Sequence, residues 1–187
     1  NASIDSTEFY RESPGIPKSL AKIKYSYTNN ESETSWISLG FLPLSGKIFS
    51  ISRQEKIGAR YKPETWTAFD NLQAAFEKKY GAPTFTSKFG TPPASYIVFD
   101  KNMKRTKTEP CMGVVIGSAL LRQTDDRCGI ELGYQWRQGE DRKFIGLASG
   151  LEVALNNYAM INSEIKLINL KAAEIQKQQR EQGSRNN

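Results

Sequence analysis

Between residues 21 and 57, three runs alternate between apolar and polar residues, a period of two that is typical of half-buried strands. In "AKIKYSYTN", Ile23, Tyr25 and Tyr27 alternate with lysine and serine, and the pattern resumes in "SWISLGFLPL" and "LSGKIFSISRQEKI" after short turn clusters. We expect these three runs to form an antiparallel meander. Residues 1–19 before them are polar and contain two prolines, so they predict an extended N-terminal arm.

A helical period follows in "KPETWTAFDNLQAAFEKKYGAP". Pro63 suits a first helical turn, and Gly81 and Pro83 are typical of a left-handed cap and a stop. Apolar residues recur at steps of three or four, which gives one stripe made of Trp66, Phe69, Leu72, Phe76 and Tyr80. The sequence therefore predicts a helix over 63–80.

The second half of the chain returns to strand patterns before a final helix. The runs "TFTSKF", "SYIVFD" and "CGIELGYQW" predict strands, and the alternating "LEVAL" favours a strand over 150–157, with a helix from Leu147 as the alternative. From Ala159 to about residue 178, apolar residues step by four and three, which predicts a helix with a seam of Ile161, Ile165, Ile168, Ala172 and Ile175. The polar end of the chain predicts a disordered tail over 179–187.

These elements predict an α+β fold, an antiparallel sheet with two long helices packed on one face. The length of 187 residues and the hydrophobic content of 38% suit a single domain, which we place at 20–178. No apolar run approaches the roughly 18 residues of a membrane helix, so we expect no transmembrane segment. The start at Asn1, without Met or an apolar signal core, is consistent with a processed secreted protein or with a trimmed chain.

The sequence contains no histidine. This excludes Ser-His-Asp and Cys-His catalysis, HExxH zinc sites and imidazole pH switches, and two cysteines alone cannot complete a structural zinc site. Two S-x-x-K matches, at Ser19–Lys22 and Ser163–Lys166, lack the partner motifs of acyl-transfer enzymes. Adjacent turn acids such as Asp125 and Asp126 are typical of solvated loops. We therefore assign no catalytic residue, no metal site and no cofactor.

The two cysteines, Cys111 and Cys128, enclose "MGVVIGSALLRQTDDR". If 112–121 and 128–136 formed a flat hairpin, the sulfur atoms would lie roughly 30 Å apart, whereas a disulfide needs Cα atoms within about 7 Å. Two alternatives remain: a disulfide that closes a compact excursion, or a long strand with two free thiols. We favour the disulfide, which would indicate an oxidising compartment.

The net charge of +6 and the pI of about 9.3 favour acidic partners. The densest basic cluster predicts an anion- or partner-contact loop, with a solvated connection as the alternative; it consists of Lys101, Lys104, Arg105 and Lys107. Few aromatic residues interleave these cations, so binding of single-stranded nucleic acid is disfavoured.

The strand "GKIFSISRQ" leads into "LQAAFEKKYGAPTF", a helix that ends in a K-Y-G-x-P phrase before further strands. Over about residues 46–100, this layout resembles exported bacterial proteins, namely the small outer-membrane assembly lipoproteins and the β-lactamase-inhibitor-like domains. The resemblance implies a periplasmic, non-enzymatic binding role. The N-terminal lipidated cysteine of those lipoproteins has no counterpart here.

We therefore expect an exported domain, periplasmic or secreted after removal of a signal peptide, that binds another protein. The partner would be an acidic protein, such as an envelope component or a toxin or enzyme that the domain inhibits. The alternatives are an enzyme that uses carboxylate or lysine chemistry on an anionic substrate, and a nucleic-acid- or anion-binding module that uses the basic cluster. The oligomeric state stays open.

Overall fold

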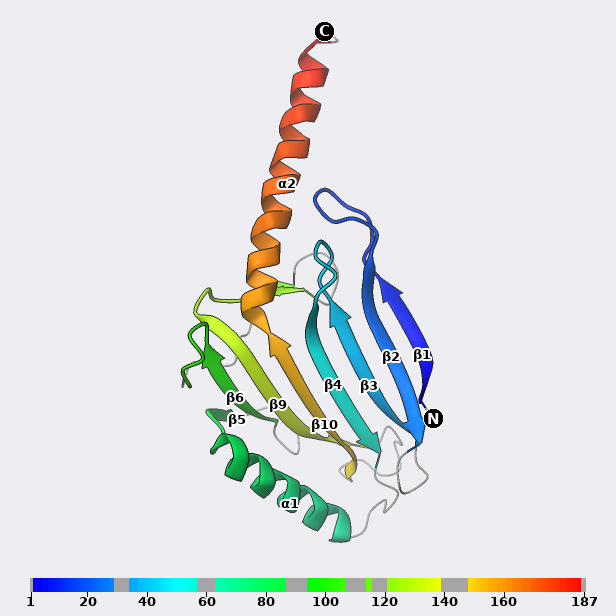
Figure 1. Ribbon diagram of the computed structural model, residues 1–187, viewed down its shortest axis with the longest axis vertical. Coiled ribbons are helices and arrows are strands. Elements are labelled where there is room, and N and C mark those ends of the chain that lie inside the picture. The colour runs from blue at the N-terminus through cyan, green and yellow to red at the C-terminus, as the bar shows by residue number, and fades with distance from the viewer. Residues whose placement is uncertain are drawn as a thin grey trace.

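An eight-stranded antiparallel sheet and two helices make up most of the part of the chain that the structure describes (Figure 1). This computed structural model describes residues 2–28, 34–56, 63–86, 94–106, 114–115, 121–138 and 148–185. The strand order is β1-β2-β3-β4-β10-β9-β6-β5. The strands are β1 (Ala2–Phe9), β2 (Leu20–Thr28), β3 (Thr34–Phe41), β4 (Ile48–Lys56), β5 (Phe85–Thr86), β6 (Ser95–Asp100), β9 (Cys128–Gln138) and β10 (Ala148–Asn157). The α+β class with an antiparallel sheet is thus confirmed.

The helices are α1 (Pro63–Tyr80) and α2 (Tyr158–Arg185), and a separate two-stranded ladder joins β7 (Val114–Val115) to β8 (Arg122–Gln123). The helix predicted over 63–80 is confirmed, as are the meander β2-β3-β4 and a strand over 150–157. Helix α2 begins directly after β10 because the Asn157 side chain caps it. The Asn157 Oδ1 accepts a hydrogen bond from the Met160 backbone N–H at 3.1 Å.

The predicted N-terminal arm contains an edge strand. Residues 2–9 form β1, which pairs antiparallel with β2, and all eight residues are exposed. Glu8 and Asp5 lie 3.4 Å from the ammonium groups of Lys22 and Lys24. A fully exposed strand needs no apolar alternation, which is why its polar sequence predicted an arm.

Helix α2 also differs from its prediction, because residues 179–185 are helical where a disordered tail was expected. Its first turns pack on the sheet, and the rest projects beyond it (Figure 1). Adding one residue to an existing helix requires no new nucleus, and Glu, Gln, Lys and Arg are good helix formers. Lys177 and Glu181 also approach one another at i and i+4, with 3.9 Å between Nζ and Oε1.

The two helices contact opposite faces of the sheet. Phe76 of α1 stacks on Tyr134 of β9, with ring centroids 5.4 Å apart, whereas the Tyr158 hydroxyl of α2 donates a hydrogen bond to Glu131 of β9. Tyr134 and Glu131 are three residues apart in a regular stretch of strand, so their side chains point to opposite faces. The prediction that both helices pack on one face is therefore not met. We call these two sides the α1 face and the α2 face.

A cluster of buried hydrophobic residues lies on the α2 face and joins α2 to the sheet and the N-terminal segment. It comprises Tyr10, Ile16, Ala21, Leu42, Phe49, Val98, Leu121, Cys128, Tyr158, Ile161, Ile165 and Ile168. Glu164 of α2 is buried beside this cluster and accepts hydrogen bonds from the backbone N–H groups of Leu44 and Ser45 at 2.6 and 2.8 Å. Gly15, with φ +81°, lies where a Cβ atom would collide with the Ile168 carbonyl, so only glycine fits at this crossing.

Candidate functional site

Small side chains on neighbouring strands leave a hollow of about 360 Å³ on the α2 face. Its floor consists of Ser38, Gly40, Ser50, Ser52, Gly133 and Ala154. Aromatic and aliphatic side chains stand around this floor, and they belong to Phe49, Tyr96, Tyr158 and Ile161. The volume falls within the range of about 300–1,000 Å³ that is usual for ligand pockets. We call this feature the sheet hollow.

Strand register brings these small residues together. Ser38 pairs with Ser52, Ser52 with Ala154, and Ala154 with Gly133, which gives one row across β3, β4, β10 and β9. Side chains at paired positions point to the same face, so this row has nothing larger than a hydroxymethyl group. The adjacent row runs from Gly40 through Ser50 and Asn156 to Glu131.

The two glycines of the floor let aromatic rings approach the sheet closely. A Cβ atom at Gly40 would lie 3.1 Å from the Phe49 ring, and one at Gly133 would lie 3.0 Å from the Tyr96 ring. These distances are shorter than an ordinary carbon–carbon contact of about 3.5–4.0 Å, so larger residues would push the rings away. The glycines thus help to define the shape of the sheet hollow.

Polar groups in the sheet hollow are held by hydrogen bonds. Glu131, which is 6% exposed, accepts hydrogen bonds from the Tyr158 hydroxyl at 3.3 Å and from the Asn156 amide at 3.4 Å. The Asn156 Oδ1 accepts one from the Ser50 hydroxyl at 2.7 Å. Glu152 accepts one from the Gln54 amide at 3.3 Å. These contacts fix two carboxylates and an amide before any ligand arrives, which lowers the entropy cost of binding.

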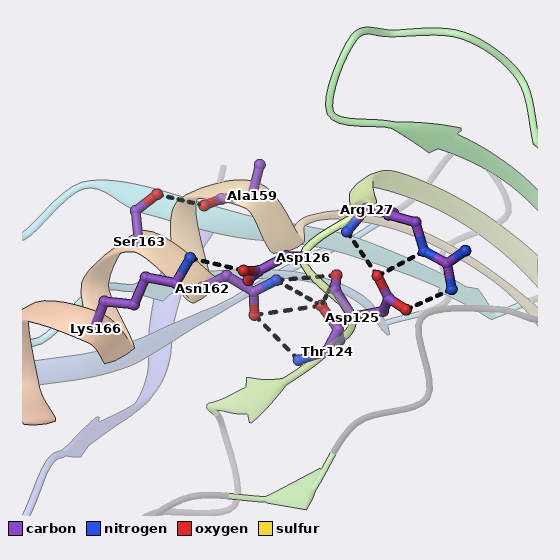
Figure 2. A network of polar contacts seen from close by, with 8 residues as sticks. All are labelled: Thr124, Asp125, Asp126, Arg127, Ala159, Asn162, Ser163 and Lys166. Carbon is purple, nitrogen blue, oxygen red and sulfur yellow. Dashed lines mark hydrogen bonds and ion pairs between the residues drawn. The ribbon is translucent and has the colours of Figure 1, made fainter.

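Figure 2 shows polar contacts that attach the turn at residues 124–127, before β9, to the start of α2, and we call this network the clamp. The Asn162 Oδ1 accepts a hydrogen bond from the Thr124 backbone N–H at 3.1 Å, and its Nδ2 donates to the Asp125 carbonyl at 3.2 Å. Lys166 forms an ion pair with Asp126 at 2.8 Å. Because Tyr158 and Ile161 precede Asn162 on the same helix, the clamp helps to hold this wall of the sheet hollow in place.

The adjacent acids Asp125 and Asp126 lie in this clamp and do not line the sheet hollow. The Asp125 carboxylate accepts hydrogen bonds from the Arg127 side chain at 2.9 and 2.7 Å and from its backbone N–H at 2.8 Å. These bonds lower the pKa of Asp125 to about 2. Both carboxylates have structural partners. Ser163 of the second S-x-x-K match donates its hydroxyl hydrogen bond to the Ala159 carbonyl within the helix.

The predicted basic cluster lies elsewhere, on a tight turn after β6. Lys101, Lys104 and Arg105 are exposed, while Lys107 lies outside the described residues. The Asp100 carboxylate accepts hydrogen bonds from the backbone N–H groups of Asn102 and Lys104 at 2.8 and 2.9 Å. The Arg105 guanidinium donates to the Ala82 carbonyl. The turn therefore has its own structural support, and its cations do not line the sheet hollow.

Cys128 is buried at the start of β9, and Cys111 lies outside the described residues. Both edges of β9 are occupied, by β10 and by β6, so the long hairpin with 112–121 is not formed. Instead, Val114 pairs with Gln123, which turns the chain back between the two cysteine positions. The flat hairpin of 112–121 with 128–136, which would have kept the two sulfur atoms apart, is thus wrong. The Cys111–Cys128 disulfide stays a prediction.

Comparison with known proteins gives no match, whether to a family model, to a curated protein or to a solved structure. Fold and site therefore define this protein only as an α+β domain with a preformed sheet hollow. In the described part of the chain, no three His, Cys, Asp or Glu side chains are grouped to hold a metal ion. Neither of the helices described has the length and apolar character needed to cross a membrane.

The sheet hollow was not predicted from the sequence. A signal for it exists on two neighbouring predicted strands. Small residues occupy one set of alternate positions, namely Ser38, Gly40, Ser50 and Ser52, while the aliphatic residues Ile37, Leu39 and Ile51 occupy the other set. Such a pattern indicates that small residues cover one face of the sheet. The residues that β9 and β10 contribute to the sheet hollow could not be predicted, because the position of these strands next to β4 depends on pairing between distant segments.

Proposed function

We propose that this chain is an exported, non-enzymatic domain that binds another protein, and that the sheet hollow receives part of that partner. The observation that carries the proposal is the hollow itself, about 360 Å³ with hydrogen-bonded polar groups and aromatic walls. Concave sites with apolar walls and a few fixed polar groups are the usual form of a ligand-binding pocket.

The chemistry of the sheet hollow favours a segment with donor groups. Glu131 and Glu152 provide carboxylate oxygens, the serines of the floor provide hydroxyls, and Tyr96 and Tyr158 provide ring faces. A lysine, arginine or glutamine side chain of the partner combines an apolar stem with N–H donors and matches this surface. An acidic region of the same partner would bind outside the hollow, where Lys101 and Lys104 are exposed.

Carboxylate catalysis is the alternative, and its geometry is unfavourable. Glu131 pairs with Asn156, which is four residues from Glu152 along β10. At about 3.3 Å per residue and 4.8 Å between strands, the two backbone positions lie roughly 14 Å apart. The paired acids of glycoside hydrolases hold their carboxyl groups about 5–9.5 Å apart. Two roughly parallel side chains at that backbone spacing do not make a catalytic pair.

A bulky substitution in the floor tests the proposal. Ser52→Trp fills the sheet hollow, and Ser6→Trp introduces the same side chain on the exposed edge strand β1 as a matched control. We expect wild type and Ser6→Trp to retain the same stoichiometric protein from a native envelope extract through a high-salt wash, and Ser52→Trp to lose it. Equal retention by Ser52→Trp, with its circular dichroism spectrum unchanged, refutes the proposal. So does the absence of any salt-resistant partner of the wild type.

A further inference from the structure

The floor of the sheet hollow has a notch at Gly133 of β9. A Cβ atom at this position would lie 3.0 Å from the Tyr96 ring and 4.0 Å from the Ala154 carbonyl oxygen. Strand register places Tyr96 of β6 and Ala154 of β10 on either side of Gly133. Glu131 lies two residues before Gly133 on the same strand, so its side chain points to the same face. All four residues line the sheet hollow, and we call the space above Gly133 the glycine notch.

Aromatic rings and a carboxylate border the glycine notch. The Tyr96 ring packs against Phe85 of β5, with ring centroids 6.0 Å apart. Tyr158 of α2 also lines the sheet hollow, and its hydroxyl donates a hydrogen bond to Glu131 at 3.3 Å. Aromatic rings attract cations through their quadrupole, and a carboxylate attracts them through its charge. The surroundings of the notch therefore favour a positively charged group.

The described lining of the sheet hollow is acidic, although the whole chain is basic. The chain has a net charge of +6, whereas the described residues that line the hollow include the acids Glu131 and Glu152 and one cation, Lys22. Lys22 lies on β2, four strand positions from β9, which is roughly 19 Å at 4.8 Å per position. Its ammonium group pairs with Glu8 at 3.4 Å. The β9 end of the hollow is therefore complementary in charge to a cationic ligand.

The hydrogen bonds of Glu131 favour an ammonium group over a guanidinium group. Its Oε1 accepts from both the Tyr158 hydroxyl and the Asn156 amide, at 3.3 and 3.4 Å. A carboxylate can accept about four hydrogen bonds, so these two neutral donors do not saturate it. A guanidinium binds a carboxylate best through both oxygens at once, which would compete with the two donors on Oε1. A compact ammonium needs a single oxygen and can be added beside them.

We propose that the glycine notch binds an alkylammonium group, and that a lysine side chain of the protein partner presents it. This inference rests on the proposed function, because it takes the occupant of the sheet hollow to be a segment of that partner. The apolar stem of the lysine would lie on the floor, where Ser52 and Ala154 have short side chains. Its ammonium would lie beside Glu131, which is 6% exposed, so salt screens their attraction less than it would at the surface.

Titration of the full, isotope-labelled chain with n-butylammonium at constant ionic strength tests the notch itself. We expect saturable shifts of the Glu131 and Gly133 amide resonances, with a dissociation constant of about 1–10 mM for so small a probe. n-Butylguanidinium should bind at least about tenfold more weakly, and the neutral n-butanol should not shift these resonances. Glu131→Gln should weaken n-butylammonium binding at least about tenfold. Glu174→Gln is the matched control, because it removes the same charge from an exposed position on α2, and it should bind as wild type does.

Three results of this titration overturn the proposal. The first is the absence of a saturable shift with n-butylammonium up to about 50 mM, well above the expected dissociation constant. The second is equally tight binding of n-butylguanidinium or n-butanol. The third is a folded Glu131→Gln variant that binds n-butylammonium as tightly as wild type. The comparison of the three probes needs only the wild type, so it decides the question even if Glu131→Gln does not fold.

Chemical modification of the native envelope extract separates this inference from the proposed function. Acetylation removes the charge of the partner's lysines, whereas reductive methylation keeps it. We expect wild type to retain the partner from the methylated extract but not from the acetylated one. If wild type retains the partner from the acetylated extract, or loses it from both, while Ser52→Trp still fails to retain it from the untreated extract, the lysine is refuted and the proposed function stands. Equal retention by Ser52→Trp refutes the proposed function, and the partner lysine with it.

Discussion

Substitution of Asn162 tests the clamp between α2 and the turn before β9. Asn162→Ala removes the acceptor for the Thr124 N–H and the donor for the Asp125 carbonyl. Thr124 is 8% and Asn162 is 6% exposed, so water does not readily replace the first bond. A buried donor left without a partner costs about 2 kcal/mol, and the loss of a more exposed hydrogen bond costs about 1 kcal/mol. We therefore expect a loss of about 3 kcal/mol in the free energy of unfolding.

Urea denaturation followed by circular dichroism measures this loss. The midpoint should fall while the slope stays constant, because the substitution does not change the surface exposed on unfolding. The melting temperature should drop by roughly 6–12 °C for a chain of this length. Asn162→Asp should also destabilise, since a carboxylate would then face the Asp125 carbonyl.

Ser163→Ala is the control, because Ser163 is exposed on the same helical turn and its hydroxyl bonds only within the helix. It should change the free energy of unfolding by less than about 0.5 kcal/mol. If Asn162→Ala unfolds at the wild-type urea concentration, or if Ser163→Ala destabilises equally, the hydrogen bonds of the clamp are not what stabilises this junction.

Two further predictions concern acid stability and the cysteines. The pKa of Asp125 is about 2, below its ordinary value, so its contribution to stability is present above about pH 4 and disappears as the pH falls from about 4 to about 2. Asp125→Asn should lack this contribution, so melting temperatures of variant and wild type should converge toward pH 2; a constant difference from pH 5 to pH 2 contradicts the assignment. For Cys111 and Cys128, mass spectrometry of the oxidised, denatured chain should detect no alkylated thiol before reduction and two afterwards. Two adducts without reductant exclude the disulfide.

Local signals sufficed where the local sequence determines structure. The helix at 63–80 combines Pro63, an apolar stripe and Gly81, and Gly81 indeed adopts φ +83°. The meander was predictable because each of its strands pairs with its neighbour in sequence. The edge strand β1 was not predictable in this way, because its exposed residues carry no periodic pattern. It is a strand because it pairs with β2, and its own sequence does not indicate that pairing.

Long-range pairing explains what the sequence did not reveal. The insertion of β10 and β9 beside β4 decides which side chains line the sheet hollow, and a one-residue change of register would exchange its two faces. The opposite placement of the helices has the same origin. An apolar stripe on a helix indicates that one side is buried but not which side of a sheet buries it. Glu131 illustrates the limit, because the approach of Tyr158 and Asn156, more than twenty residues away in the sequence, turns this strand residue into a fixed acceptor.

The projecting part of α2 has a mechanical consequence. Ile161 lies at the wall of the sheet hollow, and Ser184 lies 23 residues further along one continuous helix, which places it roughly 35 Å away at 1.5 Å per residue. A tilt of the helix by about 5° around its packed end would displace Ser184 by about 3 Å over that lever arm. A spin label or fluorophore at Ser184 would therefore magnify small rearrangements at the base of the helix into distances that spectroscopy resolves.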